Sequence, residues 1–454
     1  MKTILKCLID FSLFEKYEKE YFIRNKIIPI FEDNIYLKVA VCKSSNLNSI
    51  KNDFAKLISF EEIDELELFF ILSNLDKKIL LNSLANKSIF QNSFEKFVNR
   101  FLDELLLFSI EVRASDIHIE KYKNLVIFKF RVDGKLKIFF TFKGEFFRFV
   151  SSYIKLISNL DMTMIRLPLD GRFSLTLNDK KYDFRVSTMP TLDSESIVLR
   201  ILDTKNINKN LETLGLSKDL LQILKENLKL TQGLILISGP TGSGKTTTLY
   251  SILKELNSEE KKIITVEDPI EYKIDSICQI PINNKIGLNF EVVLKNILRQ
   301  DPDIIFIGEI RDKFSLEIAL QASLTGHLVL ASIHSNSAVE TISRLIDLQA
   351  DPFLISTTLK LVMAQRLVLN YCKFCGSTGC EKCNFTKFYD RSSIAEILKI
   401  DENLSSLIFK KSSINEFKEY LKTISFKTLF DDGKEKVKNN ITSLEEVLKV
   451  VTYL

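Results

Sequence analysis

The sequence predicts an α/β protein whose second half is built on a parallel sheet, with smaller α/β domains before it. From residue 234 onward, short apolar runs alternate with stretches that place apolar residues at helical spacing. Buried parallel strands joined by helices give this pattern, because the helices cover both faces of the sheet. The first apolar run also leads directly into a glycine-rich turn and a helix.

That turn lies in LILISGPTGSGKTTTLY, which places G-x-x-x-x-G-K-T between a strand and a helix. Glycines let backbone N–H groups close around phosphate oxygens, and the helix directs its positive end at the same anion. Lys245 is then expected to reach the β and γ phosphates, and Thr246 to complete the shell of Mg²⁺. A chance glycine turn is the alternative, which the flanking strand and helix disfavour. The predicted nucleotide-binding residues are Gly239, Pro240, Thr241, Gly242, Ser243, Gly244, Lys245, Thr246 and Thr247.

Length and composition bound the class of protein. The 454 residues suffice for roughly two to four domains. The net charge of +4 gives no support for a nucleic-acid or membrane partner. Charged residues interrupt the N-terminus, which predicts an amphipathic helix and not a signal peptide. Because no apolar run is long enough to span a bilayer, we expect a cytoplasmic protein.

Residues 1–85 carry no catalytic motif and are predicted to form a small docking domain for a partner. Two short strands are expected over 27–31 and 35–41, on either side of a turn at 32–34. The rest of this segment predicts mixed α/β structure, and nothing in it identifies the partner.

Residues 86–203 predict a second α/β domain. A helix is expected over about 93–112, followed by strands from ASDIHIE, residues 114–120, to 196–202. Basic residues lie on or beside the predicted turns: Lys129, Arg131, Arg166, Arg172, Arg185 and Arg200. Any one of them is more easily explained as a solvated side chain, but as a set they suggest charge supplied to the γ-phosphate of a nucleotide. His118 is expected to be a structural, hydrogen-bonded residue at a strand end.

The polar segment 204–212 predicts a linker, and residues 213–454 form the domain with the parallel sheet. Strands are expected over 234–238, 263–266, 304–307 and 328–332, and helices over 218–228, 245–256, 290–299, 315–324 and 443–451. Functional residues of such sheets gather where the strands end. The polar clusters at those ends are Glu267, Asp268 and Glu271, then Glu309, Arg311 and Asp312, then His334 and Asn336.

Phosphoryl transfer to water needs Mg²⁺, an acceptor that orients the water, and positive charge on the phosphates. Glu309 is expected to hold Mg²⁺ through water and to help orient the attacking water. Glu267 is the better candidate for polarising that water, although the sequence does not separate the two roles. A lone acidic residue at a strand end is more often a helix cap, but two such clusters favour catalysis. His334 suits either a γ-phosphate contact or a structural role.

The stretch CKFCGSTGCEKC predicts a metal site. Its ligands are Cys372, Cys375, Cys380 and Cys383. Four thiolates give a closed tetrahedral zinc site, which is structural because no coordination position is open. A redox pair or coincidence is the alternative, and two C-x-x-C units this close disfavour it.

Several motifs occur in the order typical of the type II/type IV secretion ATPase superfamily. GPTGSGKTTTLY, ITVEDPIEY, LRQDPDIIFIGEIRD and LTGHLVLASIHSN resemble its Walker A motif, Asp box, Walker B motif and His box. ASDIHIE, LPLDGRF and RVSTMPT resemble its second N-terminal domain. The resemblance implies a RecA-like ATPase core, a PAS-like second N-terminal domain and a hexamer whose domains close on ATP. It implies Lys245 and Thr246 as phosphate and Mg²⁺ ligands, Glu267, Glu309 and His334 as active-site residues, and Arg172, Arg185 and Arg200 as inter-domain nucleotide contacts.

The cysteine cluster resembles that of the secretion and pilus-extension branch, typified by general secretion pathway protein E and PilB-type proteins. The retraction branch lacks these cysteines. The resemblance implies a motor peripheral to the inner membrane that acts on a platform protein and docks on a cytoplasmic domain of the machine. Protein secretion, pilus extension and DNA uptake all stay open. A P-loop nucleic-acid translocase is the alternative, which the near-neutral charge disfavours.

Overall fold

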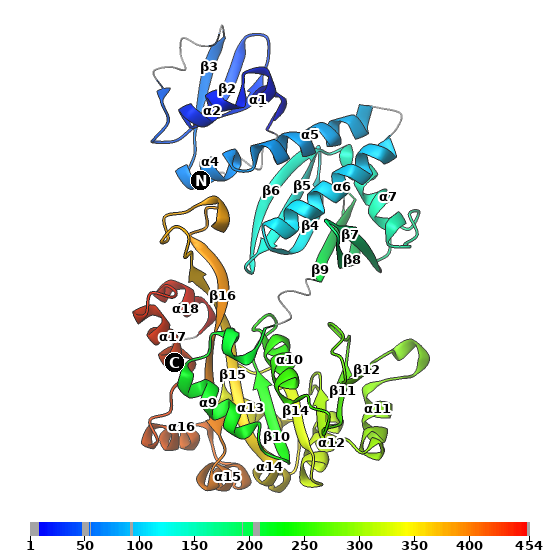
Figure 1. Cartoon of the computed structure of the whole chain (residues 1–454), viewed down its shortest axis with the longest axis vertical. Coiled ribbons are helices and arrows are strands. Elements are labelled where there is room, and N and C mark those ends of the chain that lie inside the picture. The colour runs from blue at the N-terminus through cyan, green and yellow to red at the C-terminus, as the bar shows by residue number, and fades with distance from the viewer. Residues whose placement is uncertain are drawn as a thin grey trace. The chain divides into compact units, whose positions relative to one another are not determined.

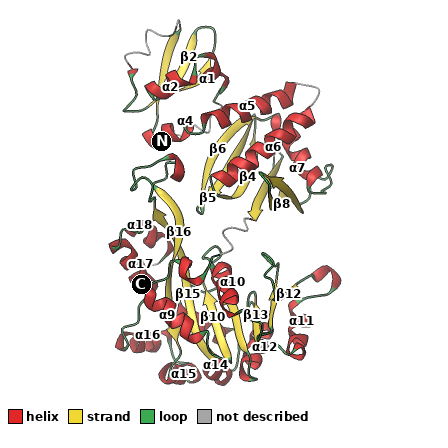
Figure 2. Ribbon diagram, viewed as in Figure 1, coloured by secondary structure: helices red, strands yellow, loops and turns green. Residues whose placement is uncertain are grey.

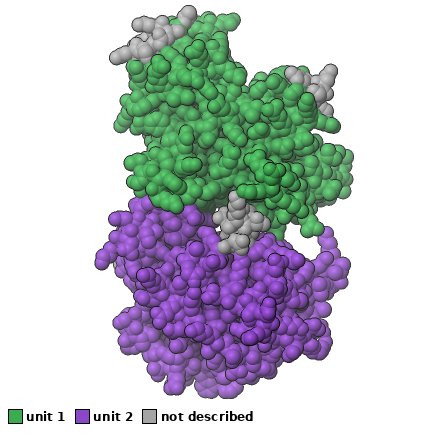
Figure 3. Space-filling view, in the orientation of Figure 1, with its two compact units in different colours: residues 1–203, 372–389 green, residues 204–371, 390–454 purple. Residues whose placement is uncertain are grey.

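The computed structural model describes residues 9–47, 54, 56–90, 94–192, 194–202 and 209–451. The chain forms two compact units, which Figure 3 shows in different colours. Unit 1 comprises residues 1–203 and 372–389, and unit 2 comprises residues 204–371 and 390–454. Within the described ranges, no helix is both long and apolar enough to cross a membrane.

Unit 1 begins with a three-stranded sheet in the order β1-β2-β3. Its strands are β1 (Ile27–Glu32), β2 (Tyr36–Val41) and β3 (Leu57–Glu62). β1 and β2 pair antiparallel around the predicted turn, whereas β2 and β3 pair parallel. The single N-terminal helix expected from the sequence is wrong for the described residues, where two short helices, α1 (Ser12–Lys16) and α2 (Lys19–Asn25), replace it. The break falls at Glu18, whose φ of 62° no α-helix accommodates.

The second sheet of unit 1 has the order β6-β5-β4-β9-β8-β7, and its neighbouring strands pair antiparallel. Its strands are β4 (Ala114–Tyr122), β5 (Leu125–Val132), β6 (Lys135–Lys143), β7 (Leu169–Leu177), β8 (Lys180–Pro190) and β9 (Glu195–Leu202). The helices α4 (Glu65–Leu72), α5 (Leu75–Phe90), α6 (Phe94–Glu111) and α7 (Phe146–Ile157) complete the unit. Figure 1 shows α5, α6 and α7 beside this sheet.

Alternation along the strands decides which face of this sheet is covered. Phe184 and Val186 of β8 are buried in the core, and Arg185 between them lies on the opposite face because strand side chains alternate.

The boundary predicted between residues 85 and 86 falls inside α5, which runs through it without a break. Residues 204–208 of the predicted linker lie outside the described residues, and Leu211–Leu214 form the 3-10 helix η2.

Unit 2 contains the predicted parallel sheet, in the order β12-β11-β13-β14-β10-β15-β16. Its strands are β10 (Gly233–Ser238), β11 (Ile263–Glu267), β12 (Cys278–Pro281), β13 (Ile304–Ile307), β14 (Leu328–Ile333), β15 (Leu359–Tyr371) and β16 (Phe388–Lys399). The pairs β11/β12, β11/β13, β13/β14, β14/β10 and β10/β15 are all parallel. Figure 2 shows these strands as one layer between helices. The predicted fold class is confirmed.

Both faces of this sheet are buried, and alternate residues of one strand enter opposite cores. Leu234 and Leu236 of β10 belong to one core, whereas Ile235 and Ile237 belong to the other. This explains why the strands are apolar without alternation in the sequence. One core includes residues of α11 (Phe290–Ile297), α12 (Lys313–Leu324), α13 (Ala338–Asp347), α14 (Pro352–Thr358), α15 (Glu402–Phe409), α16 (Ile414–Thr423), α17 (Leu429–Lys438) and α18 (Leu444–Val450). The other includes residues of η2, α9 (Lys218–Asn227) and α10 (Lys245–Leu256).

Candidate functional site

The glycine-rich loop follows β10 at its carboxyl end, and its backbone requires glycine. Gly239, Gly242 and Gly244 have φ values of 150°, 80° and 92°, a region that other residues rarely adopt. A Cβ on Gly239 would also lie 2.5 Å from the Ser243 Oγ atom. A Cβ on Gly242 would meet nothing within 4 Å, so this residue is needed for its φ alone.

Lys245 is the first residue of α10, and its ammonium group turns back over the loop. Nζ donates hydrogen bonds to the carbonyl oxygens of Gly239 and Pro240, at 2.7 and 3.1 Å. Burial lowers the pKa of Lys245; the charge of Glu309 opposes this and that of Arg366 adds to it. Phosphate oxygens can replace these two carbonyl oxygens as acceptors, and the ammonium group then keeps its hydrogen bonds.

Two hydroxyl groups of the loop support the same interpretation. Ser243 is 3% exposed, and its Oγ atom has no hydrogen-bond partner among the described residues. A buried hydroxyl without a partner is costly, and a bound group supplies one. The Thr246 side chain is exposed beside Lys245. The loop therefore fits a nucleotide phosphate, with an ammonium group and a free buried donor.

Glu309 and His334 come together at the ends of neighbouring parallel strands. Glu309 follows β13 and His334 follows β14, and the distance from His334 Nε2 to Glu309 Oε1 is 2.8 Å. Arg311 binds the second carboxylate oxygen through Nε and Nη2, at 2.8 and 2.7 Å. The Glu309 side chain stays 21% exposed, and its charge acts on Lys245. A partly exposed carboxylate oriented by two donors suits the predicted role of contacting water or a hydrated cation.

Glu267, in contrast, faces into unit 2. It ends β11, is 3% exposed, and accepts hydrogen bonds from the Tyr250 hydroxyl, from Thr265 Oγ1 at 2.6 Å and from Gln279 Nε2 at 3.3 Å. Burial and the hydrogen bond to Glu267 raise the pKa of Tyr250. Because Tyr250 belongs to α10, Glu267 ties the helix after the glycine-rich loop to β11. Its role in polarising water stays a prediction.

Other members of the predicted clusters have structural contacts. Asp312 caps α12, because its Oδ1 accepts a hydrogen bond from the Ser315 N–H at 2.8 Å. The Glu271 N–H donates to the Tyr250 hydroxyl at 3.2 Å. The Asn336 carbonyl accepts a hydrogen bond from Arg366 Nη2 at 2.8 Å.

Two residues of β15 that were not predicted from the sequence also contact the site, Gln365 and Arg366. Both are buried, and Gln365 hydrogen-bonds to the glycine-rich loop. The available signal was two adjacent polar residues inside an otherwise apolar strand, since a buried polar side chain needs a partner.

The predicted arginines of unit 1 form a row on one face of its larger sheet. Arg172 of β7 is directly opposite Arg185 of β8, which in turn is opposite Arg200 of β9. Like charges directly opposite one another destabilise a sheet, so such a row calls for negative charge beside it. Asp116 on β4 pairs with Arg200, with a distance of 2.9 Å between Oδ1 and Nε.

Two expectations for this domain are corrected. Arg131 lies beside the turn that follows β5, as expected, but Lys129, Arg172, Arg185 and Arg200 lie inside strands, because the strands are longer than their apolar runs. His118 lies inside β4 and not at its end, and its buried Nε2 atom has no hydrogen-bond partner among the described residues. Burial lowers the pKa of His118, and the charge of Arg131 lowers it further.

The cysteines converge as a metal site requires. The Sγ atoms of Cys372, Cys375, Cys380 and Cys383 lie within 4.8 Å of one another. The Cys372–Cys380, Cys375–Cys383 and Cys380–Cys383 distances are 3.9, 3.9 and 3.8 Å. Zinc–sulfur bonds of about 2.3 Å give tetrahedron edges of about 3.8 Å. Burial opposes the Cys375 thiolate, but hydrogen bonds from the Gly379 N–H and the other thiols outweigh it and lower its pKa to about 7.

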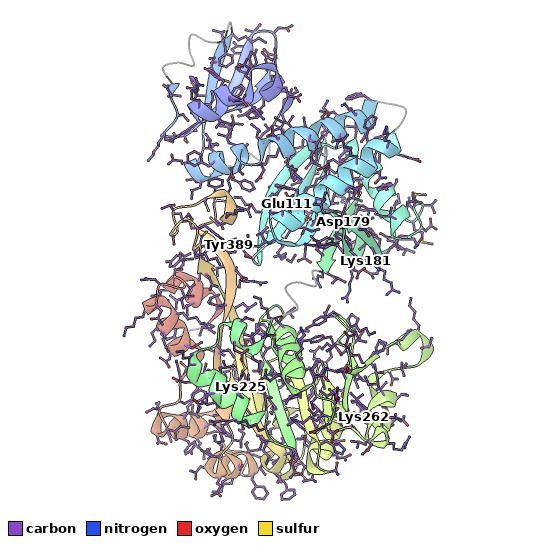
Figure 4. All side chains as sticks on the ribbon, in the orientation of Figure 1. Glu111, Asp179, Lys181, Lys225, Lys262 and Tyr389 are labelled. Atoms are coloured by element: carbon purple, nitrogen blue, oxygen red, sulfur yellow. The ribbon has the colours of Figure 1, made fainter. Side chains whose placement is uncertain are left out.

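Residues 372–389, which we call the metal element, pack within unit 1, although in the sequence they follow β15 of unit 2. The sequence analysis placed them in the sheet domain. Phe385 stacks on Phe69 of α4, with 5.9 Å between ring centroids. The Arg113 guanidinium group lies 3.7 Å from the ring centroid of Tyr389, which Figure 4 labels. Nζ of Lys137 donates to the Asn384 carbonyl at 3.2 Å.

Relatives of this chain are secretion proteins. Type II secretion system protein E of Pseudomonas aeruginosa is 40% identical over 376 residues, which cover 77% of this chain and 75% of the relative. Type II secretion system ATPase E of Vibrio cholerae is 38% identical over 390 residues, which cover 80% and 77%.

Solved structures agree. The pilus retraction motor PilT with bound ADP matches with a TM-score of 0.58 and 25% identity, over 78% of this chain and 97% of PilT. The ATPase DotB of Legionella pneumophila shares the fold, with a TM-score of 0.63 at 24% identity over 77% of this chain and 95% of DotB. The model of the family described as Type II/IV secretion system protein matches residues 91–449. The chain therefore belongs to that family, and it is an ATPase of the branch that contains type II secretion system protein E.

Proposed function

We propose that this chain is a hexameric, Mg²⁺-dependent ATPase that powers assembly of a type II secretion pseudopilus or a related pilus at the inner membrane. The observation that carries the proposal is the pairing of Glu309 with His334 beside the Lys245 loop. A carboxylate, an imidazole and an ammonium group meet at one edge of the sheet, where a nucleotide fits.

Each residue has a role in hydrolysis that its contacts support. Lys245 exchanges its two loop carbonyls for β- and γ-phosphate oxygens, and Ser243 and the loop N–H groups donate to the same phosphates. Glu309, oriented by His334 and Arg311, accepts a hydrogen bond from the attacking water. Thr246 and Glu309 are the residues placed to hold Mg²⁺, which when bound neutralises charge on the β and γ phosphates.

The arginine row supplies the remaining positive charge. Arg172, Arg185 and Arg200 lie directly opposite one another across β7, β8 and β9, and Arg200 also pairs with Asp116. A nucleotide phosphate would supply negative charge to this row. We therefore assign Arg172 and Arg185 to the transferred phosphoryl group and Arg200 to nucleotide binding, with closure of the domains bringing them to it.

The wider machine is inferred from the relatives. Two of them are named as type II secretion proteins, so protein secretion is the favoured process, with pilus extension and DNA uptake as outcomes of the test. An inner-membrane platform protein and a cytoplasmic docking domain are the proposed partners, and residues 1–85 are the proposed docking segment. The metal element holds one structural zinc ion.

The machine is tested by co-purifying the intact chain from its host and identifying the retained proteins. A polytopic membrane protein together with a pilin-like protein supports the proposal, and hexamer mass in the presence of a non-hydrolysable ATP analogue supports the oligomeric state. Retained nucleic acid that stimulates hydrolysis would replace the proposal with a translocase.

Lys245→Ala is expected to abolish ATP hydrolysis, with a loss of about a hundredfold or more, because the main cationic contact to the phosphates disappears. Hydrolysis is measured by phosphate release at saturating ATP. Lys225→Ala on α9 is the matched control, since Lys225 is a partly exposed lysine outside the loop, paired with Glu212 and Glu255. Unchanged turnover in Lys245→Ala would refute the nucleotide site.

Arg172→Gln and Arg185→Gln are each expected to lower kcat at least about tenfold, because charge on the transferred phosphoryl group is lost. The melting temperature of Arg172→Gln should not fall, since this variant removes one of two like charges directly opposite each other. Arg148→Gln, an exposed arginine of α7, is the control. If kcat is retained in both row variants, the arginines have no part in catalysis.

Cys375→Ser is expected to lose zinc and lower the melting temperature together, because three thiolates leave the site open. Zinc per chain is measured by elemental analysis. Cys278→Ser, an exposed cysteine outside the cluster, is the control and should keep about one zinc per chain. Full zinc in Cys375→Ser would contradict the four-thiolate site.

A further inference from the structure

β15 runs alongside β10 up to the start of the glycine-rich loop. The two strands are parallel, with Ile237 opposite Met363 and Ser238 opposite Ala364. Gln365 and Arg366 are the next two residues of β15. The strand pairing therefore places them level with Gly239 and Pro240, where the loop leaves the sheet.

The Gln365 side chain is 1% exposed and joins three segments of unit 2. Its Oε1 accepts a hydrogen bond from Thr248 Oγ1 of α10 at 2.7 Å. Its Nε2 donates to the Ser243 carbonyl of the loop at 3.1 Å and to Ser393 Oγ of β16 at 3.0 Å. The orientation of the amide is determined, because the Ser243 carbonyl only accepts and must therefore face the nitrogen.

The loop is packed tightly onto this residue. A Cβ on Gly239 would lie 2.6 Å from the Gln365 carbonyl oxygen, and a Cβ on Gly244 would lie 2.8 Å from Nε2. Both distances are too short for a real contact. Two glycines of the phosphate loop are thus needed for their fit against Gln365 as well as for their φ.

Arg366 extends the same connection to the loop that carries His334. Its guanidinium group is buried and donates to the Gln365 carbonyl at 2.9 Å through Nη1 and to the Asn336 carbonyl at 2.8 Å through Nη2. Burial lowers the pKa of Arg366, and the charges of Glu396 and Glu340 oppose that shift. The loops on the two sides of the nucleotide site are therefore both held by consecutive residues of one strand.

We propose that Gln365 is a positioning residue for ATP hydrolysis: its amide holds the Ser243 carbonyl and Thr248 so that the loop N–H groups face the phosphates. Gln365 does not touch the phosphates, and it acts through the loop and the first turns of α10. Loss of the Nε2 donor leaves the Ser243 carbonyl without its partner and lets the loop rotate away from its phosphate-binding form. The inference rests on the nucleotide site of the proposed function and on no property of the hexamer or the machine.

The test is Gln365→Glu in the full-length chain, with ADP binding measured by calorimetry. At pH 8 the carboxylate places an acceptor against the Ser243 carbonyl, and the dissociation constant for ADP is expected to rise about tenfold. At pH 6 part of this loss should be recovered, because a protonated carboxyl group again donates to that carbonyl. The variant should raise KM for ATP by more than it lowers kcat.

Gln321→Glu, on the exposed surface of α12, is the matched control and should bind ADP like the parent chain. If Gln365→Glu binds ADP like this control at both pH values, the inference is overturned while the nucleotide site stands. If the parent chain itself binds no ADP, the proposed function fails instead.

Thr248→Val tests the same role of Gln365 if the melting temperature of Gln365→Glu is too low for a binding assay. It removes only the donor to Gln365 Oε1 and keeps the size of the side chain. ADP affinity is expected to fall about threefold. Unchanged affinity in a variant with an unchanged melting temperature would overturn the inference.

Discussion

The hydrogen-bonded placement of β10 between β14 and β15 is the constraint on which the nucleotide site depends. Its parallel register sets the level at which the glycine-rich loop leaves the sheet. The neighbouring parallel strands β14, β13 and β11 then end at the same edge, which brings His334, Glu309 and Glu267 towards the loop. A one-residue slip of β10 would exchange its two sets of side chains between the cores, so burial on both faces fixes this register.

Charges in and around this site are tolerated because each has a defined partner. Lys245 donates hydrogen bonds to two loop carbonyls, and Arg366 donates to the carbonyls of Gln365 and Asn336. Glu267 accepts a hydrogen bond from the Tyr250 hydroxyl. Unpaired burial of such groups would cost several kcal/mol each, of order 3 to 5 for a broken buried pair. The same contacts connect the loop, α10, β11 and β15. The hydrogen bonds that stabilise the buried charged groups therefore also hold these segments in position.

Unit 1 shows a different balance. Helices cover one face of its larger sheet. Arg172, Arg185 and Arg200 lie side by side on the other face. Asp116 of β4 supplies one negative charge to this row through its ion pair with Arg200. The metal element adds an anchored segment to this unit through Phe69, Arg113 and Lys137. Bound zinc would keep its short loop folded, since the element has too few apolar residues for a core of its own.

The sequence by itself determined β10, β11, β13 and β14, the glycine-rich loop, the family and the four cysteines, because each depends on a local pattern: apolar runs, glycines at fixed places, and fixed spacing. β12, β15 and β16 were not predicted as strands, since polar residues such as Gln365, Arg366 and Glu396 interrupt them. Those side chains find partners in distant segments, at the Ser243 carbonyl, the Asn336 carbonyl and the Ala338 N–H. Tertiary structure alone decided that Glu309 pairs with His334 while Glu267 is buried against Tyr250. It also decided that the metal element packs in unit 1, because these contacts join residues far apart in the chain, whose pairing no local pattern encodes.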